Sequence, residues 1–77
     1  MSKEDILKAY SEKLKEIAPL VTAQDRRDAC QELNCDIATV SKYFNGKGAK
    51  IDFADSLLKL FTTKINDRSK MLELVKN

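Results

Sequence analysis

Only one residue, Cys35, separates a residue that ends helices from a residue that begins them. Asn34 is one of the few non-glycine residues that tolerate the left-handed conformation at a helix exit. Asp36 is a good N-cap, because its carboxylate can accept hydrogen bonds from the free N–H groups of a first helical turn. The pattern therefore predicts two helices joined by a turn of about three residues.

The first two helices have recognisable starts. Ser2 with Asp5, and Thr22 with Asp25, are spaced so that the first side chain of each pair can cap a helix start. Pro19 cannot continue a helix and disfavours helical geometry at the residue before it, so the first helix is expected to end there. Apolar residues at helical spacing give the inner faces: Ile6, Tyr10, Leu14 and Ile17 in the first helix, and Ala29, Cys30 and Leu33 in the second.

Two further helices are predicted in the same way. A helix of about nine residues follows Asp36 and is closed by Asn45-Gly46, and Asp52 with Asp55 is expected to cap the next one. Beyond Asn66-Asp67 the apolar pattern resumes, either as a continuation of the fourth helix or as a separate short helix. The expected inner positions are Val40, Tyr43 and Phe44 in the third helix, Phe53, Leu57, Leu60, Phe61 and Ile65 in the fourth, and Met71, Leu72 and Val75 in the tail.

No run of residues alternates between apolar and polar side chains as a half-buried strand would. The predicted fold class is therefore all-α, a compact bundle of four to five helices. With 77 residues, the chain is expected to form one domain over its whole length, residues 1–77. A core this thin leaves little room for an enclosed active-site cavity.

Composition narrows the class of protein. A hydrophobic content of 43% with 34% charged residues is typical of a soluble globular protein. No apolar run approaches the roughly 20 residues that span a bilayer. The N-terminus also lacks the pattern of a secretion signal. We therefore expect a cytoplasmic protein without a membrane partner.

The residue types leave little for catalysis or metal binding. The chain has no histidine, no phosphate-cradling glycine loop and no cysteine with a plausible base partner. We therefore expect no enzymatic activity, no cofactor and no small-molecule substrate. A zinc site usually takes four Cys or His ligands, and Cys30 and Cys35 supply at most two. Both thiols are expected to be small buried side chains.

Positive charge gathers in the second half of the chain. Residues 1–35 carry six basic and seven acidic side chains, whereas residues 36–77 carry eight basic and five acidic ones. Between residues 37 and 51 the sequence has Lys42, Lys47 and Lys50 and no acidic residue. A local basic stretch of this kind suits contact with nucleic-acid phosphates, which a few cations on one face can make.

The segment Arg26–Gly46, RRDACQELNCDIATVSKYFNG, resembles the helix-turn-helix of the lambda-repressor-like (phage-repressor, XRE-type) transcription regulators without a gap. The resemblance places Cys30 at the helix crossing, and Asn34 at the turn position where the family favours glycine. Cys35 matches a buried apolar residue and Asp36 a capping residue. The inward positions of the recognition helix correspond to Val40, Tyr43 and Phe44.

The resemblance implies a sequence-specific, double-stranded-DNA-binding transcription regulator, a phage-type repressor that reads the major groove with helix 36–45. Ile37, Ala38, Ser41 and Lys42 would face base edges. The loop 46–50 would approach the phosphate backbone, because its glycines have no side chain to hold a phosphate away. The expected DNA-binding residues are Gln24, Arg26, Ile37, Ala38, Thr39, Ser41, Lys42, Asn45, Lys47 and Lys50.

Several positions have a second interpretation. The cap at Thr22 starts the second helix about a turn before Arg26, which moves the expected phosphate contact to Thr22, Ala23 or Gln24. Ile37 suits the core, three positions before Val40, as well as a groove-facing site. Lys42 could be a solvated surface lysine, and the loop lysines could be incidental to a flexible connection. The rival function is a helix-turn-helix scaffold used as a protein–protein adaptor or inhibitor.

The C-terminal segment, residues 67–77, is a candidate dimerisation helix. Leu58, Phe61, Ile65, Leu72 and Val75 form an apolar stripe on a continuous helix, which predicts a homodimer. Arg68 interrupts this stripe where an apolar residue would serve better. The alternative is that Met71, Leu72 and Val75 fold back onto the first helix and complete the monomer core.

Overall fold

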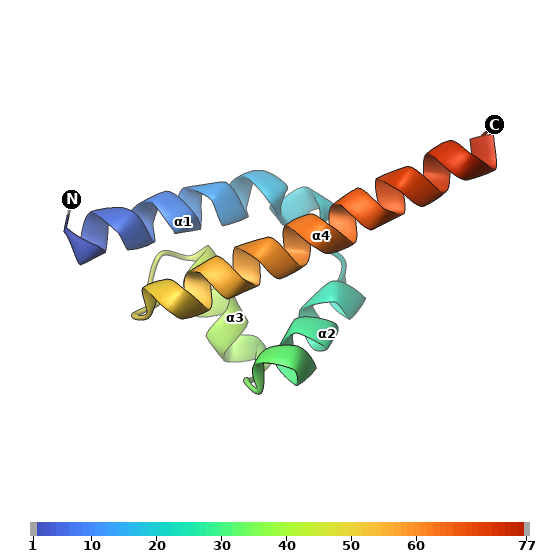
Figure 1. The fold of residues 1–77 in the computed structure, drawn as a ribbon. Coiled ribbons are helices and arrows are strands. Elements are labelled where there is room, and N and C mark those ends of the chain that lie inside the picture. The colour runs from blue at the N-terminus through green and yellow to red at the C-terminus, as the bar shows by residue number, and fades with distance from the viewer. Residues whose placement is uncertain (1, 77) are drawn as a thin grey trace.

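The computed structural model describes residues 2–76, and every regular element in this range is helical (Figure 1). This confirms the predicted all-α fold. The elements in chain order are α1 (Lys3–Ile17), the short 3-10 helix η1 (Ala18–Leu20), α2 (Ala23–Leu33), α3 (Ile37–Phe44) and α4 (Ile51–Lys76).

The starts of α1 and α2 are capped by the predicted side chains. The Ser2 hydroxyl accepts a hydrogen bond from the Asp5 N–H at 3.2 Å. Thr22 and Asp25 cap each other's backbone: the Thr22 hydroxyl accepts from the Asp25 N–H, and the Asp25 carboxylate accepts from the Thr22 N–H, both at 3.0 Å. Pro19 lies in η1, so α1 ends just before it, as predicted.

The core is built from large apolar side chains of several helices. Leu14 of α1, Val40 of α3, and Leu57 and Phe61 of α4 are fully buried. The Phe61 ring lies 5.7 Å from the Phe44 ring, which joins α4 to the end of α3. Burying a side chain of this size contributes about 1.5–3 kcal/mol. The other buried apolar residues are Ala29, Tyr43, Phe44 and Ala54.

The start of α4 differs from the prediction. The helix begins at Ile51, so Asp52 lies in its first turn and Asp55 one turn further on. Neither residue is the N-cap, and that prediction was wrong. Asp55 is instead used in tertiary structure, where its carboxylate accepts a hydrogen bond from the Tyr10 hydroxyl at 2.9 Å and pairs with Lys59 at 2.8 Å.

The end of α4 settles an alternative that the sequence left open. Beyond Asn66-Asp67 the chain continues the same helix, which is 26 residues long. Figure 1 shows its C-terminal part extending past the other helices. Met71, Leu72 and Val75 are exposed, so they do not fold back onto α1. That interpretation of the tail was wrong.

Arg68 links α4 to the start of α2. Its guanidinium lies 2.8 Å from the carboxylate of Asp25, and its second terminal nitrogen donates to the Leu20 carbonyl oxygen at 2.6 Å. Asp25 is buried, although it also caps α2. A second pair joins the same two helices, because Lys64 lies 3.3 Å from the carboxylate of Asp28. The arginine that interrupts the apolar stripe therefore holds α2 in place.

Within residues 2–76 we find no helix long and apolar enough to cross a membrane.

Candidate nucleic-acid interface

The turn between α2 and α3 has the predicted geometry. Asn34 is in the left-handed conformation, with φ of 53°. The N–H groups of Asn34 and Cys35 both donate to the carbonyl oxygen of Cys30, that of Cys35 at 3.0 Å, and so close the end of α2. Asp36 caps α3, its carboxylate accepting from the Thr39 N–H at 2.8 Å. Asn34 and Asp36 thus set the bend between the two helices.

The capping carboxylate is held in its charged form. The Thr39 hydroxyl donates to Asp36 at 2.7 Å, and this bond, with the one from the Thr39 N–H, lowers the pKa of Asp36. The charge also suits the positive end of the α3 dipole. Thr39 was expected to contact DNA. Its hydroxyl instead belongs to the cap.

The two cysteines are half-buried instead of fully buried. On α2 the completely buried small residue is Ala29, one position before Cys30. Burial raises the pKa of the Cys35 thiol, and the neighbouring Cys30 raises it further. A thiol with a raised pKa remains protonated and is a poor nucleophile. Among the described residues, no three His, Cys, Asp or Glu side chains gather in a way that could hold a metal ion.

One side of α3 is buried and the other is open. Val40, Tyr43 and Phe44 face the core, as predicted. Positions 38, 41, 42 and 45 lie on the opposite side, because residues three, four and seven apart share a helix face. Ala38, Lys42 and Asn45 are exposed, and Ser41 is half-buried. We call these four residues the outer face of α3.

The loop after α3 is fixed against the helix. The N–H of Lys47 donates to the carbonyl of Lys42 at 2.8 Å, and the N–H of Lys50 donates to the Tyr43 hydroxyl at 3.1 Å. Gly48 lies against the Tyr43 ring, where an added Cβ would be only 2.2 Å from the ring carbon Cδ1. The other neighbour of the ring is Phe53, at 4.7 Å between centroids. The loop is therefore held in place by Tyr43.

Sequence reasoning treated Tyr43 only as a core residue and missed this role. A tyrosine at a core position does carry a hint, since a buried hydroxyl usually finds a hydrogen-bond partner. Ser11 was also missed. It is buried on α1, and its hydroxyl donates to the Phe44 carbonyl at 3.2 Å, which ties α1 to the end of α3.

Three lysines lie together on one side of α3 and the turn before it: Lys42, Lys47 and Lys50. All three are exposed, and none takes part in an ion pair among the described residues. They line an open hollow of about 400 Å³ that also reaches Asn34 and Cys35 in the turn. Unpaired cations beside an exposed helix face form a surface that attracts anions.

Two residues expected at the DNA, Gln24 and Arg26, have partners within the protein, whereas Ile37 is exposed. Gln24 is exposed, but its side chain donates to Asp28 at 2.9 Å and accepts from Arg27 at 3.0 Å. Arg26 is half-buried, and its guanidinium lies 4.3 Å from the centroid of the Phe44 ring. This is a cation–π geometry, so the cation is anchored to the end of α3. Ile37 is 46% exposed and is not a core residue.

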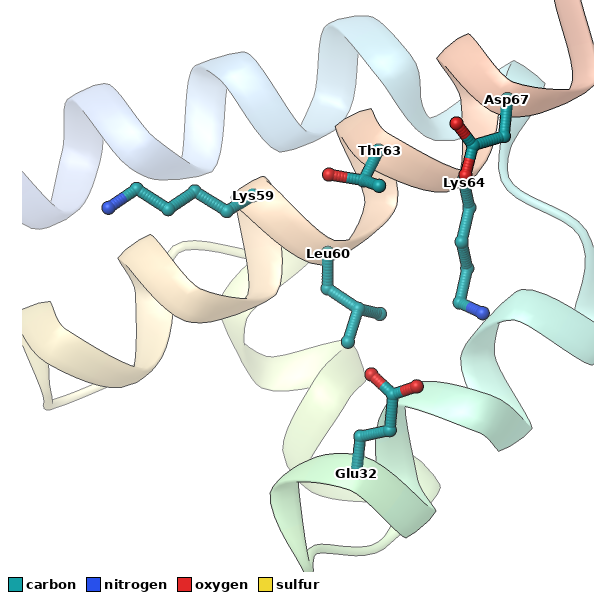
Figure 2. Close-up of a pocket in the computed structure, with 6 residues that line it drawn as sticks. All are labelled: Glu32, Lys59, Leu60, Thr63, Lys64 and Asp67. Atoms are coloured by element: carbon teal, nitrogen blue, oxygen red, sulfur yellow. The ribbon is translucent and has the colours of Figure 1, made fainter.

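A second hollow lies between α2 and α4, with a volume of about 480 Å³. Figure 2 shows Leu60 projecting from α4 toward Glu32 on α2, and Lys64 reaching from α4 toward α2. Lys64 is already paired with Asp28. Charges of both signs and one leucine line this groove, and they define no particular class of ligand.

Comparison with known proteins adds no relative. No protein-family model, no curated protein and no solved structure matches the chain.

Proposed function

We propose that this protein binds double-stranded DNA in a sequence-specific manner, with α3 in the major groove. The observation that carries the proposal is the open outer face of α3, which adjoins the unpaired Lys47 and Lys50 of the fixed loop. A major groove about 12 Å wide admits one α-helix. The resemblance of residues 26–46 to phage-repressor regulators supports the same function and suggests transcription regulation, with repression as the specific activity.

The residues divide into two roles. Ser41 and Lys42, on the outer face of α3, contact base edges, and the Ala38 methyl group contacts a thymine methyl. Lys47 and Lys50 contact phosphates and so fix the position of the protein on the duplex. The two free thiols of the described chain suit a reducing compartment, which supports action in the cytoplasm.

Electrostatic binding is tested by titrating labelled duplex DNA with the protein at two salt concentrations and measuring fluorescence anisotropy. Each phosphate contact adds about −0.9 to the slope of log affinity against log salt. Lys47→Ala and Lys50→Ala should each weaken binding to all sequences about equally and flatten the slope by about 1. Lys13→Ala is the matched control. Lys13 also is a lysine at the surface, but it lies beside Leu58 in the hollow between α1 and α4, not in the one that Lys47 and Lys50 line.

Sequence readout needs a different measurement, the selection of bound sites from random DNA. Ser41→Ala and Lys42→Ala should change the preferred sequence, since each good base contact is worth about 1–3 kcal/mol of discrimination. The Lys47→Ala variant should keep the original preference at lower affinity. No preferred sequence for the wild type would overturn sequence-specific binding.

The rival function is protein–protein contact through the same surface. Ile37 favours it, because a large apolar side chain that is 46% exposed stands at the start of α3, next to Ala38. Affinity for DNA that is unchanged in the Ser41, Lys42, Lys47 and Lys50 variants would support this adaptor or inhibitor function. Loss of DNA binding in those variants would exclude protein–protein contact as the main activity of this surface.

A further inference from the structure

The two cysteines of the sequence lie at the two positions that the turn between α2 and α3 brings together. Cys30 is in the last turn of α2, and Cys35 directly follows the left-handed Asn34. A helix that ends in a left-handed residue commonly places the next residue against a residue of its own last turn. Both thiols are free and half-buried, so the turn holds two unmodified thiols side by side near the surface.

The backbone at these two positions is within the reach of a disulfide bond. The N–H of Cys35 donates to the carbonyl oxygen of Cys30 at 3.0 Å. The Cα of Cys35 is one covalent bond from that nitrogen, and the Cα of Cys30 is two bonds from that oxygen. The two Cα atoms are therefore at most about 7 Å apart, and closer because these bonds are not collinear. Disulfides usually join Cα atoms that are about 4.4–6.8 Å apart.

The two thiols also act on each other. Burial raises the pKa of the Cys35 thiol, and Cys30 raises it further through its charge and through a hydrogen bond between the two side chains. A hydrogen bond between side chains requires that the two sulfur atoms are neighbours. Cys35 also lines the open hollow beside Lys42, so a small solute can reach the pair from this side.

We propose that Cys30 and Cys35 form a redox-active pair, which a low-molecular-weight disulfide such as oxidised glutathione converts into an intramolecular disulfide. The Cys30 thiolate attacks one sulfur of the reagent, which releases one glutathione thiolate and leaves the other glutathione bound to Cys30 as a mixed disulfide. Cys35 then loses its proton and attacks the Cys30 sulfur, which releases the second glutathione thiolate. The two thiols lose two protons and two electrons, and the reagent takes up the electrons as two thiolates.

The order of the two attacks follows from the surroundings of Cys35. Its raised pKa keeps this thiol protonated, so Cys30 makes the first attack. In the mixed disulfide Cys30 no longer carries a negative charge, and its contribution to the raised pKa of Cys35 disappears. Cys35 therefore becomes a better nucleophile once Cys30 has reacted, which favours closure of the disulfide over accumulation of the adduct.

The inference goes beyond the proposed DNA-binding function and does not depend on it. The disulfide would fix by a covalent bond the bend from which α3 projects. If α3 reads DNA, oxidation would act on the part of the protein that orients the reading helix. The test below is made without DNA, so its outcome is independent of DNA binding.

The full chain is equilibrated with mixtures of reduced and oxidised glutathione, quenched with acid and analysed by mass spectrometry. The expected product is a monomer that has lost two hydrogen atoms and carries no glutathione. The same equilibrium is then measured in about 8 M urea, where the turn is lost and only the short separation along the chain favours the disulfide. The equilibrium constant should be at least about 10-fold larger for the folded chain, because a disulfide that fits the fold stabilises it by the same factor.

Cys35→Ser is the matched control, because it keeps Cys30 and removes the thiol that displaces glutathione. The variant should accumulate the mixed disulfide that the wild type resolves. A wild-type chain that keeps both thiols reduced, or one that ends mainly as glutathione adducts or as disulfide-linked dimers, would overturn the proposal. An equilibrium constant in the folded chain equal to or smaller than that in urea would overturn it as well, since the turn would then not hold the thiols in place for the bond.

Discussion

Replacing Arg68 with methionine tests whether the contact between α4 and the start of α2 stabilises the fold. Methionine keeps most of the apolar stem and removes the guanidinium. The substitution deletes the donors to the Asp25 carboxylate, at 2.8 Å, and to the Leu20 carbonyl, at 2.6 Å. Asp25 keeps its hydrogen bond from the Thr22 N–H. A carboxylate whose side chain is only 7% exposed would then lack its cation.

The expected loss of stability follows from this burial. Breaking a buried ion pair costs about 3–5 kcal/mol. The Arg68 side chain is 42% exposed, so solvent screens its half of the interaction and lowers the value. We therefore expect Arg68→Met to lower the free energy of unfolding by about 2 kcal/mol at pH 7. For a domain of this size that corresponds to a melting temperature lower by roughly 8–16 °C.

The pH dependence gives this prediction its specific signature. Burial by itself would raise the pKa of Asp25, but the hydrogen bond from the Thr22 N–H and the interactions with Arg68 outweigh burial and lower it. Because the folded-state pKa lies below the unfolded value, the carboxylate stabilises the fold above pH ~3.8. That stability is lost as the pH falls through the folded-state pKa. Without Arg68 the folded-state pKa rises, so the wild-type advantage should shrink as the solution is acidified.

The assay is urea denaturation followed by circular dichroism at pH 7 and at pH 3. Lys64→Met is the matched control, since Lys64 joins the same two helices through the more exposed Asp28. We expect the control to lose less stability than Arg68→Met at pH 7. Equal losses in the two variants, or an Arg68→Met effect that is the same at both pH values, would refute the reasoning.

Four other substitutions, at three positions, test the turn and the loop. Gly48→Ala should cost about 1–3 kcal/mol, because the new Cβ would meet the Tyr43 ring, and an unchanged urea midpoint would contradict this. Tyr43→Phe should cost about 1 kcal/mol and speed hydrogen exchange of the Lys50 N–H, which loses its acceptor. Asn34→Gly should be neutral or stabilising by up to about 1 kcal/mol, whereas Asn34→Ala should destabilise, because φ at this position is 53°. Melting temperatures would show the difference between the two Asn34 variants.

The helix ends that the sequence predicted correctly are those decided by residues close together in the chain. Thr22 and Asp25 cap each other three residues apart, and Asp36 caps its own first turn. Asn34 supplies the left-handed exit by its own conformational tolerance. Asp55 shows the limit of this reasoning. Its partners, above all Tyr10, come from tertiary packing, and no local pattern distinguishes such a carboxylate from a cap.

In the candidate site too, some positions follow from the local sequence and others depend on tertiary packing. The resemblance gave Ala38, Ser41 and Lys42 as groove-facing positions. The inward face formed by Val40, Tyr43 and Phe44 agrees with this, because it leaves those positions on the opposite side of α3. Arg26 was expected at the DNA because of its place in the resembling segment. Whether its guanidinium is free depends on what lies across the fold, and there the Phe44 ring is 4.3 Å away. The packing of α2 on α3 thus determines where the Arg26 guanidinium lies.

Arg68 interrupts the apolar pattern of the sequence, and the structure shows the reason for its charge. In the sequence it weakens the apolar stripe and argues against a paired helix. In the structure it occupies the last position of the stripe that still touches the body, where the available groups are a carboxylate at Asp25 and the Leu20 carbonyl. An apolar side chain at this position would leave the buried Asp25 carboxylate without its cation and would remove the donor to the exposed Leu20 carbonyl. The stripe changes partner at this point: before Arg68 it packs on the chain's own core, and from Leu72 onward its apolar residues have no partner within the described chain. The charge therefore serves the monomer, because it holds the start of α2 against α4.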